Sequence, residues 1–521
     1  MYETERYHDR TKHSWESVRR GGRLLSWADK PDPFKHYPGA ERAALPRELP
    51  SPEVPALESV YGGGQDSARP LDLTGLARLL RWGAGIARTR RLAGETYHFR
   101  TYPSAGALYP VEVYVACASL DGLPAGLYHF HPGELALQRL RQRDVRGHLA
   151  AAGAEEELAG AGAVLCLSGI PWRTGWKYGE RGYRHLFWDA GTMLANLIAL
   201  AASGGLGPRL RAGFVDREAN ALLGLDGERE AVLALLAVGG SEGPAEGGSA
   251  GPGAEGWQDR AQQAGELEPI EFHPRPLSRW EEDYPAAHAA HAAAALESAE
   301  EVRAWRERAA RGMERGPEAS TAVPPPGRLP SDPLEAVIRR RGSARAFAPE
   351  SIAREELEAI LGCAAAPIPA DVPPLCETYL IVHAVETLDS GVYRLSPQRE
   401  LERLRAGNFR ERAAHLCLEQ EHGGSGAVTL FLLCDLPMAL AGLGERGYRA
   451  AQLEAGVRAG RVSLAAYTLG LGATGLTFYD DEVAEFLTGE TRTQPMMCVS
   501  LGLDARRRDL RRVRERLGIG E

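Results

Sequence analysis

Two adjacent side chains that can transfer protons, Lys177 and Tyr178, stand out in the sequence. Only four of the 61 basic residues are lysine, so a lysine deep in the chain is not there merely for surface charge. An amine can act as a general base and a phenol can donate or relay a proton. The pair also fits an accidental surface pairing, and the repeat described below favours the chemical role.

A second candidate segment, residues 102–110, reads Tyr-Pro-Ser-Ala-Gly-Ala-Leu-Tyr-Pro. Small residues just before a strand let the backbone approach a flat ligand closely, and the hydroxyl of Ser104 adds a donor. Taken alone, the segment fits an ordinary Pro/Gly turn better.

A third candidate is the run of arginines at 339–345, where Arg341, Ser343 and Arg345 alternate with small residues. Guanidinium forks and a hydroxyl in this order can bind a phosphate. Taken alone, the run also fits a solvated basic stretch.

The elements that must position these residues occur twice. Gly-Glu-Arg-Gly-Tyr-Arg at 179–184 returns unchanged at 444–449, which is 265 residues later. The same offset relates Gly-x-Tyr at 126–128 to 391–393, and Gly-Leu-Gly at 205–207 to 470–472. Several matches in one register indicate an internal duplication whose period is too long for a solenoid, so each half is expected to be a domain.

Each half shows the same order of predicted elements. An amphipathic helix (73–82; 354–361) leads to a strand (111–115; 378–382) and a Gly-x-Tyr turn. A long helix (183–203; 448–469) then ends at Gly-Leu-Gly and precedes an apolar strand (231–238; 496–501). This order predicts an α+β fold rather than a doubly wound parallel sheet.

Three regions are therefore predicted: a domain at 1–240, a linker at 241–328 and a second, partly degenerate domain at 329–521. The linker opens with a Gly/Ser/Pro-rich stretch at 240–249. An alanine-rich segment at about 286–311 predicts one helix with Trp305 on one face, and Pro-Pro-Pro-Gly at 324–327 ends it.

Bulk composition excludes several classes of protein. A hydrophobic content of 44% and a charged content of 25% are those of a soluble globular protein. A net charge of -9 argues against nucleic-acid binding, and no apolar run approaches the roughly 20 residues that span a bilayer. The seven cysteines never form a CxxC, so no disulfide scaffold and no metal site is expected. The charged N-terminus predicts a cytoplasmic protein.

The first half resembles the SagB-type dehydrogenases, the azoline-oxidising branch of the nitroreductase superfamily. The similarity lies in the string 102–110, in Gly-Leu-Tyr-His-Phe at 126–130 and in the stretch from Lys177 to Gly191. Shorter matches lie at 7–14 and 31–35. The second half resembles the general nitroreductase pattern through residues 341–347 and the Gly-Leu-Gly at 470–472.

This resemblance implies a nitroreductase-like fold, duplicated in tandem and packed as an intramolecular pseudo-dimer with flavin mononucleotide (FMN) at its interface. Arg341, Ser343 and Arg345 would bind the phosphate end of the flavin, and backbone amides near Thr477 and Phe478 would add further contacts to it. The opposite edge would be formed by Pro103, Ser104, Ala105, Gly106 and Leu108. Lys177 would be the catalytic base, and Tyr178 would relay or position the proton.

Each half lacks what the other retains. An offset of 281 places Arg341, Ser343 and Arg345 opposite Val60, Gly62 and Gly64. Residues 103–110 correspond to 368–375, where an acid, Asp371, has appeared. Lys177 and Tyr178 correspond to Gly442 and Leu443, so the repeated motif does not itself need the pair. One composite site and one FMN per chain are expected, with a single chain sufficient for function.

The resemblance implies oxidation of a thiazoline or oxazoline in a ribosomal peptide to the azole, with a peptide or small-molecule substrate and a cyclase as partner. Two alternatives remain open. An NAD(P)H-dependent nitro- or quinone-reductase would bleach its flavin with NAD(P)H. A non-catalytic flavin-binding scaffold of a peptide-modifying complex would not turn over.

Overall fold

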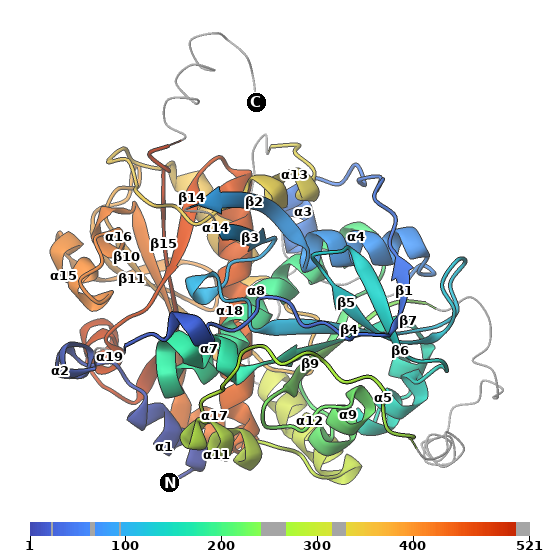
Figure 1. Cartoon of the computed structure of the whole chain (residues 1–521). Coiled ribbons are helices and arrows are strands. Elements are labelled where there is room, and N and C mark those ends of the chain that lie inside the picture. Colours follow the sequence, from blue (N-terminus) through green and yellow to red (C-terminus); the bar gives the residue numbers. More distant parts are fainter. Residues whose placement is uncertain (22–23, 63–67, 93–94, 241–266, 315–329, 507–521) are drawn as a thin grey trace.

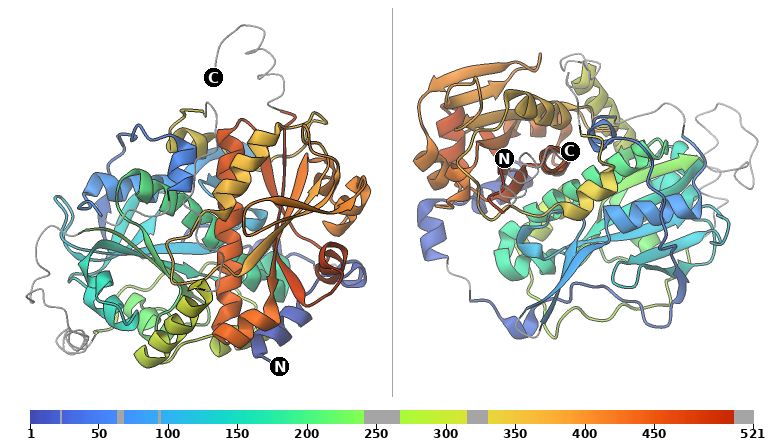
Figure 2. Two further views of the ribbon diagram at one scale, coloured as in Figure 1. Left: turned by 180° about the vertical axis from the view of Figure 1, so that it is seen from behind. Right: turned by 90° about the horizontal axis from the view of Figure 1, so that it is seen from above.

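Two antiparallel sheets, one in each half, flank two long helices that cross at the centre of the molecule (Figures 1 and 2). The computed structural model describes residues 1–521 except 22–23, 63–67, 93–94, 241–266, 315–329 and 507–521. Every pairing between the described strands is antiparallel. The expected α+β class is therefore confirmed.

The helices and strands of the first half are α1 (Glu3–Arg10), α2 (Trp15–Arg20), η1 (Trp27–Asp29), β1 (Glu41–Ala44), α3 (Ala56–Tyr61), α4 (Leu73–Gly83), β2 (Ile86–Leu92), β3 (Glu95–Arg100), η2 (Ala105–Ala107), β4 (Val111–Cys117), β5 (Gly126–His131), β6 (Ala136–Arg141), α5 (Arg146–Ala152), α6 (Glu157–Gly160), β7 (Ala161–Gly169), α7 (Pro171–Tyr178), η3 (Gly179–Arg181), α8 (Gly182–Ser203), β8 (Arg209–Arg211), α9 (Asp216–Leu223) and β9 (Ala231–Gly240).

The connector and the second half contain α11 (Pro285–Ala293), α12 (Ala299–Glu314), α13 (Leu334–Arg340), α14 (Arg354–Ala365), β10 (Cys376–Val382), β11 (Gly391–Leu395), β12 (Leu401–Ala406), α15 (Arg410–Leu416), α16 (His422–Ser425), β13 (Val428–Asp435), α17 (Leu436–Leu443), α18 (Arg446–Thr468), β14 (Gly472–Leu476), α19 (Asp480–Thr488) and β15 (Thr493–Gly502).

The duplication predicted from the sequence is visible in the sheets. The order β6-β5-β4-β7-β9-β8 of the first sheet repeats as β12-β11-β10-β13-β15-β14 in the second, and β1 adds one edge strand to the first. The pairing register is also kept: Tyr114 lies opposite Cys166, and Tyr379 lies opposite Phe431, each 265 residues later. The predicted long helices and last strands are all present.

The crossing of α8 and α18 holds the two halves together. Every one of the 23 residues of α18 and 20 of the 22 of α8 are buried, and the four arginines of α18 are buried with them. At the crossing Gly191 meets Gly456, its counterpart at the offset of 265, and a Cβ on Gly191 would lie 2.5 Å from the backbone of Gly456. Only glycine allows this approach, so the two copies meet at a pseudo-twofold axis within one chain.

One helical stretch, Pro171–Ser203, is long and apolar enough to cross a bilayer by length and composition. Its most apolar window is 89% buried inside the protein, which is the situation of a core helix.

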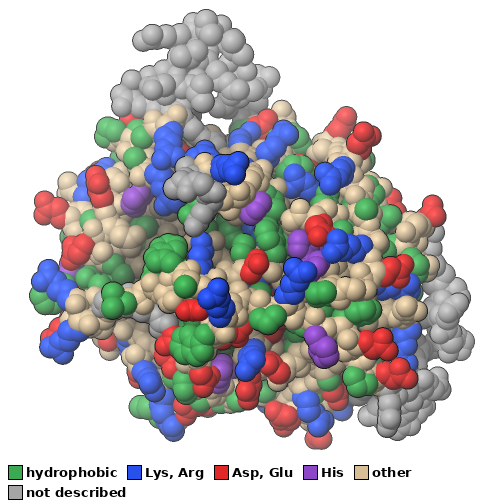
Figure 3. Space-filling model, viewed as in Figure 1, with side chains coloured by type: hydrophobic (Ala, Val, Ile, Leu, Met, Phe, Trp, Pro, Cys, Tyr) green, Lys and Arg blue, Asp and Glu red, His purple; other side chains and the backbone are tan. Residues whose placement is uncertain are grey.

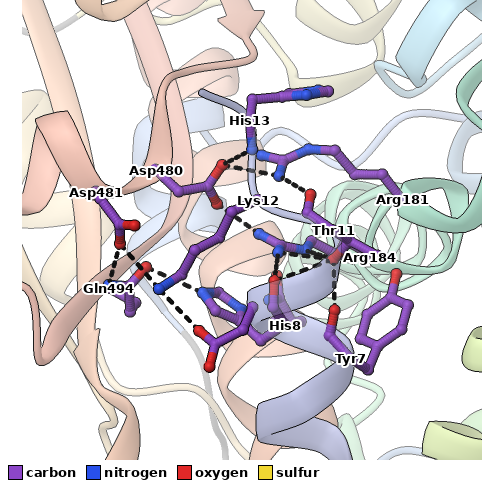
Figure 4. A network of polar contacts seen from close by, with 12 residues as sticks. Tyr7, His8, Thr11, Lys12, His13, Arg181, Arg184, Asp480, Asp481 and Gln494 are labelled. Carbon is purple, nitrogen blue, oxygen red and sulfur yellow. Dashed lines mark hydrogen bonds and ion pairs between the residues drawn. The ribbon is translucent and has the colours of Figure 1, made fainter. Parts of the chain in front are cut away.

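The repeated Gly-Glu-Arg-Gly-Tyr-Arg motif joins the halves by buried ion pairs. In one copy Arg181 and Arg184 contact Asp480 at 2.8 and 2.6 Å (Figure 4). The other copy repeats the arrangement in reverse, because Arg446 and Arg449 contact Asp216 at 2.5 and 2.6 Å. The two arginines of each half thus bind an aspartate at the start of a helix in the opposite half.

The glutamate of the same motif fixes a helix N-terminus on each side. Glu445 accepts hydrogen bonds from the first backbone amides of α1, and Glu180 accepts them from the amides at the start of α11. His8 of α1 contacts Tyr448, as His291 of α11 contacts Tyr183. Helix α11 is therefore the second-half counterpart of α1, at an offset of 283.

One expectation for the connector is wrong: the alanine-rich segment forms two helices, α11 and α12, rather than one. The amide of Leu296 donates to the Asp216 carboxylate instead of continuing the helix, and Ser298 then accepts from Glu301 and starts α12. The Gly/Ser/Pro-rich stretch after residue 240 and the prolines at 324–326 lie outside the described residues. The domain boundaries remain a prediction.

Replacing Asp480 with alanine is expected to lower the free energy of unfolding by about 3–5 kcal/mol, because two buried guanidinium groups would lose their counter-charge. Urea denaturation measures the change. The matched control is Asp481→Ala, since Asp481 is 54% exposed and pairs with Lys12 at the surface. A loss below about 1 kcal/mol is expected there, and equal losses in the two variants would refute the assignment.

The pH dependence follows from the same contact. Burial alone would raise the pKa of Asp480, but Arg181 and Arg184 hold it well below its ordinary value. Stability from this carboxylate is therefore fully present above about pH 4 and is lost as the pH falls further.

Candidate functional site

Lys177 and Tyr178 lie at the end of α7, where Gly179 turns the chain with a φ of +57°. The side chain of Lys177 is exposed, whereas the ring of Tyr178 stands edge-on against His185 with 4.3 Å between centroids. Burial raises the pKa of Tyr178, and the nearby Asp189 raises it further. The phenol therefore stays protonated at neutral pH, where it can donate a proton but cannot act as a base.

The Pro-Ser segment lies directly against this pair. A Cβ on Gly106 would fall 2.8 Å from the Tyr178 hydroxyl and 3.3 Å from the Lys177 amine. Gly106 has a φ of +62°, and Ala107 and Tyr109 also have positive φ. Non-glycine residues are strained in this region, and such strain clusters at functional sites.

Asp189 holds the segment in place. Its buried carboxylate accepts hydrogen bonds from the Ser104 hydroxyl and from the Ala105 amide, the latter at 3.1 Å. Burial raises the pKa of Asp189 to about 7, and these two hydrogen bonds oppose the rise. Sequence reasoning missed this residue. Its signal was an acid before Ala-Gly in both halves, since Glu454 occupies the position 265 residues later.

The arginine run of the second half reaches the first half beside that segment. Arg341 is 6% exposed, and its Nε donates to the carbonyl of Thr101 at 3.3 Å. Ser343 and Arg345 are exposed. Between them the amide of Ala344 donates to the carbonyl of Ala473, so the run is tied to β14.

A further cation, which sequence reasoning also missed, joins this edge from the β2–β3 hairpin. A Cβ on Gly342 would lie 3.3 Å from the guanidinium of Arg88. Burial and the neighbouring Arg90 lower the pKa of Arg88. A group of cations at this edge favours an anionic ligand.

Thr477 and Phe478 follow β14 and face the first half. The ring centroids of Phe478 and Trp188 are 6.2 Å apart. Those of Trp188 and His185 are 4.7 Å apart, and His185 in turn contacts Tyr178. A series of rings therefore connects the second-half edge to the Lys177–Tyr178 pair. The hydroxyl of Thr477 is buried and has no hydrogen-bond partner among the described residues, which fits a ligand group at this position.

The Arg181–Asp480 ion pair positions the two edges relative to each other. Arg181 lies three residues after Tyr178, Asp480 lies two residues after Phe478, and the Arg181 guanidinium lies 5.4 Å from the Phe478 ring centroid. The sequence-predicted residues of both halves thus come together on one face. This face is hollowed near its centre, and Lys and Arg side chains gather above the hollow (Figure 3).

The symmetry-related position is filled by the chain itself. Ala212 and Gly213 correspond to Thr477 and Phe478, and their amides donate to the Asp371 carboxylate at 2.7 and 3.1 Å. Arg306 of α12 also contacts Asp371, at 3.1 Å. No carboxylate contacts the Thr477 and Phe478 amides in the part of the chain that the structure describes.

Trp305 closes the same position from the other side. It is fully buried, and a Cβ on Gly213 would lie 2.7 Å from its ring. Asp371 stands where the first half has its Pro-Ser segment, and Trp305 belongs to helix α12 of the connector. Together these two residues occupy the space where a second ligand would bind.

The sequence alignment of the arginine run needs a correction. Pro55 and Pro333 pair across the pseudo-axis and begin α3 and α13, so the offset here is 278 rather than 281. Val60 is a core residue of α3 and is not opposite Arg341. The counterparts become residues 63, 65 and 67, which are Gly, Gln and Ser and lie outside the described residues. In the corrected register, too, none of the three corresponding first-half positions holds an arginine.

A cavity of about 310 Å³ lies elsewhere, and its lining includes Tyr37, residues 267–270 and residues 272–274. Its lining includes the ionisable side chains of Arg141, Glu268 and His273, but it contains none of the predicted site residues. The geometry of the side chains therefore favours the composite face as the candidate active site.

The nitroreductase family model matches residues 67–240 and 338–503, one match in each half. A protein from Methanocaldococcus jannaschii whose name assigns it to the nitroreductases, MJ1384, is 32% identical over 171 residues, or 33% of this chain and 81% of that one. The microcin B17-processing protein McbC of Escherichia coli is 32% identical over 135 residues. That match spans 24% of this chain and about half of McbC, 49%.

A solved structure from Anabaena variabilis, also assigned to the nitroreductases, resembles the whole molecule. It is 26% identical, has a TM-score of 0.74 and is covered over 96% of this chain and 99% of its own. The likeness therefore extends over both halves and their arrangement.

Proposed function

The chain belongs to the nitroreductase family, with one copy in each half, and from this premise we propose that it is an FMN-dependent oxidoreductase that converts peptide azolines to azoles. The observation that carries the proposal is the position of Lys177 and Tyr178. They lie against Gly106 at the composite site, whereas Asp371 fills the symmetry-related one. The likeness to McbC, a peptide-processing protein by name, supports a peptide substrate.

The residues of the composite site fit FMN. Arg341, Ser343 and Arg345 offer two cations and a hydroxyl for its phosphate. The amides of Thr477 and Phe478 offer donors to the polar edge of the ring, with the partnerless Thr477 hydroxyl beside them. Residues Pro103 to Leu108 cover the opposite edge. When bound, FMN would supply the acceptor for a hydride from the substrate Cβ.

The chain's own residues handle the proton. Aromatisation of the ring removes a proton from Cα together with the hydride from Cβ. The neutral amine form of Lys177 takes that proton, because the buried phenol of Tyr178 is kept protonated. Tyr178 keeps its own proton and positions the amine, which lies 5.2 Å from the centroid of its ring. The azoline must come from a reaction that dehydrates and cyclises a Cys, Ser or Thr side chain, so a cyclase acts first.

Anaerobic flavin reduction tests the proposal. A synthetic peptide with one thiazoline is expected to bleach the bound flavin, and the mass of the peptide is expected to fall by about two units. NADH and NADPH are not expected to bleach the flavin. Oxygen then restores the colour. Bleaching by NAD(P)H alone would favour a nitro- or quinone-reductase, and a colourless protein would favour a scaffold without turnover.

One FMN per chain is expected, because the symmetry-related position lacks arginines and is filled by Asp371 and Trp305. Flavin released by acid, divided by the protein concentration, gives the ratio. The Asp371→Ala variant is expected to keep a ratio of one, because removing the carboxylate does not restore a phosphate site. A ratio near two in the unmodified protein would contradict the composite-site argument.

A single chain is proposed to be the functional unit, because it carries both edges of the site covalently. If sites formed between chains, mixing an Arg341 variant with a Lys177 variant would restore activity. No such rescue is expected.

A further inference from the structure

Exposed apolar side chains are concentrated in the N-terminal arm. Nine large hydrophobic side chains are exposed among the described residues, and four of them lie between positions 15 and 27. They are Trp15 (44% exposed), Val18 (38%), Leu24 (97%) and Trp27 (66%). We refer to these four as the arm surface. Single exposed hydrophobics are common, but four of them between positions 15 and 27 of the chain favour an interaction site.

Trp27 packs against a buried ring although it is exposed. It stands on the buried ring of Trp176, with 5.3 Å between centroids and an angle of 74°. The indole nitrogen of Trp176 donates to the carbonyl of Ser26 at 2.9 Å, and the Ser26 hydroxyl donates to Asp29 at 2.6 Å. A fixed aromatic ring loses little conformational entropy on binding, so Trp27 is suited to anchor a ligand.

The arm surface leads into the candidate site. Trp176, on which Trp27 stands, directly precedes Lys177 in α7. Lys30 lies between Trp27 and Tyr97 of β3, 5.6 and 5.4 Å from their ring centroids, and β3 leads to the Pro-Ser segment. In Figure 1 the arm, dark blue, passes directly over α7.

The arm is basic although the chain has a net charge of -9. Arg10, Arg19 and Arg20 are exposed, and Arg19 lies 3.9 Å over the ring of Trp15. The one acid between positions 10 and 20, Glu16, pairs with Arg20 at 3.4 Å. Arginine next to an exposed tryptophan is the combination that dominates binding energy in protein interfaces. The charge favours an acidic partner, and the rings favour apolar side chains between the acids.

We propose that the arm surface binds an acidic peptide segment with interspersed apolar side chains, the part of the substrate that flanks the reacting ring. This inference rests on the proposed function and adds the location and chemistry of substrate recognition. An extended segment bound to Trp27 and the arginines of α2 delivers its neighbouring residue to Lys177.

Direct binding tests the inference separately from turnover. The probe is a fluorescein-labelled peptide with one thiazoline and alternating Glu and Leu, and anisotropy gives its Kd. Combined Trp15→Ala and Trp27→Ala changes are expected to weaken binding about 30-fold or more, the scale of one lost hot spot. Arg19→Glu with Arg20→Glu is expected to weaken binding and to reduce its dependence on salt.

Trp280→Ala is the matched control. Trp280 is also exposed, at 60%, and packs on Trp172 at the other end of α7. Its removal is expected to leave the Kd unchanged. A version of the probe with Lys in place of Glu is expected to bind at least ten-fold more weakly.

Three outcomes would overturn the inference: equal Kd values for the arm variants and the unmodified protein, equal binding of the Lys probe, or binding of the arm to phosphatidylglycerol vesicles in place of the peptide. Arm-dependent binding without oxidation of the thiazoline would support the inference and refute the proposed function. Oxidation with a Kd insensitive to the arm would do the reverse.

Discussion

A Lys177→Ala variant is expected to remain folded and yellow while its turnover falls roughly 10²–10⁴-fold, the usual contribution of a positioned acid–base group. Neighbouring groups do not replace the amine, because the Tyr178 phenol is kept protonated and the second-half counterpart of Lys177 is Gly442. Single-turnover flavin reduction by a thiazoline peptide measures the effect.

A structural role for Lys177 is the competing explanation, with Glu180 as the ion-pair partner. Among the described residues, however, Lys177 forms no ion pair. The Glu180 carboxylate instead accepts hydrogen bonds from the backbone amides of Ala286 and Ala287. A structural lysine would lower the melting temperature and leave the rate intact. Partial recovery of the rate by added methylamine is expected for a missing base, and flavin reduction at the unmodified rate would disprove the assignment.

Replacing Arg341 and Arg345 together with alanine is expected to give colourless protein. Each charge-assisted hydrogen bond to the phosphate contributes about 1.5–3 kcal/mol, so losing two raises the Kd for FMN roughly 10²–10⁴-fold. Titration of the apoprotein with FMN, followed by quenching of flavin fluorescence, measures the Kd.

Arg339→Ala provides the control for that experiment. Arg339 belongs to the same run and is exposed on α13, two residues before Arg341. If the run were merely a solvated basic stretch, the Arg339 and Arg345 variants would have similarly small effects. Because Arg341 also contacts the Thr101 carbonyl, its variant requires a thermal unfolding measurement beside the FMN titration. A folded, yellow double variant would contradict the phosphate site.

The sequence alone was sufficient for the duplication and for most elements of the fold. Local signals carry this information: the helix ending at Gly204 and Gly205 and the apolar last strands can be read within one half. The repeat at a constant offset needs only the comparison of the two halves of the sequence. The residues of the composite site could be named for the same reason, since each lies in a short motif that resembles a known family.

Local signals were insufficient where a distant contact competes with them. The alanine-rich segment has the composition of one helix, yet the Asp216 carboxylate takes the amide of Leu296 and breaks it into α11 and α12. The register of the arginine run could not be set from α4 and α14 alone. It depends on Pro55 and Pro333, which pair across the pseudo-axis between the two halves.

Only the tertiary structure decided why the repeated arginine motif is needed and why a second ligand site is absent. Arg184 binds Asp480, which lies 296 residues later in the sequence. Asp371 of the second half accepts hydrogen bonds from the amides of Ala212 and Gly213 in the first half. The local sequence around these arginines and amides contains no residue that predicts their partner. The partner comes within hydrogen-bonding distance only when α8 and α18 pack across each other. The sequence determined which residues could do the chemistry, and the packing of the two halves decided where one site forms and the other is closed.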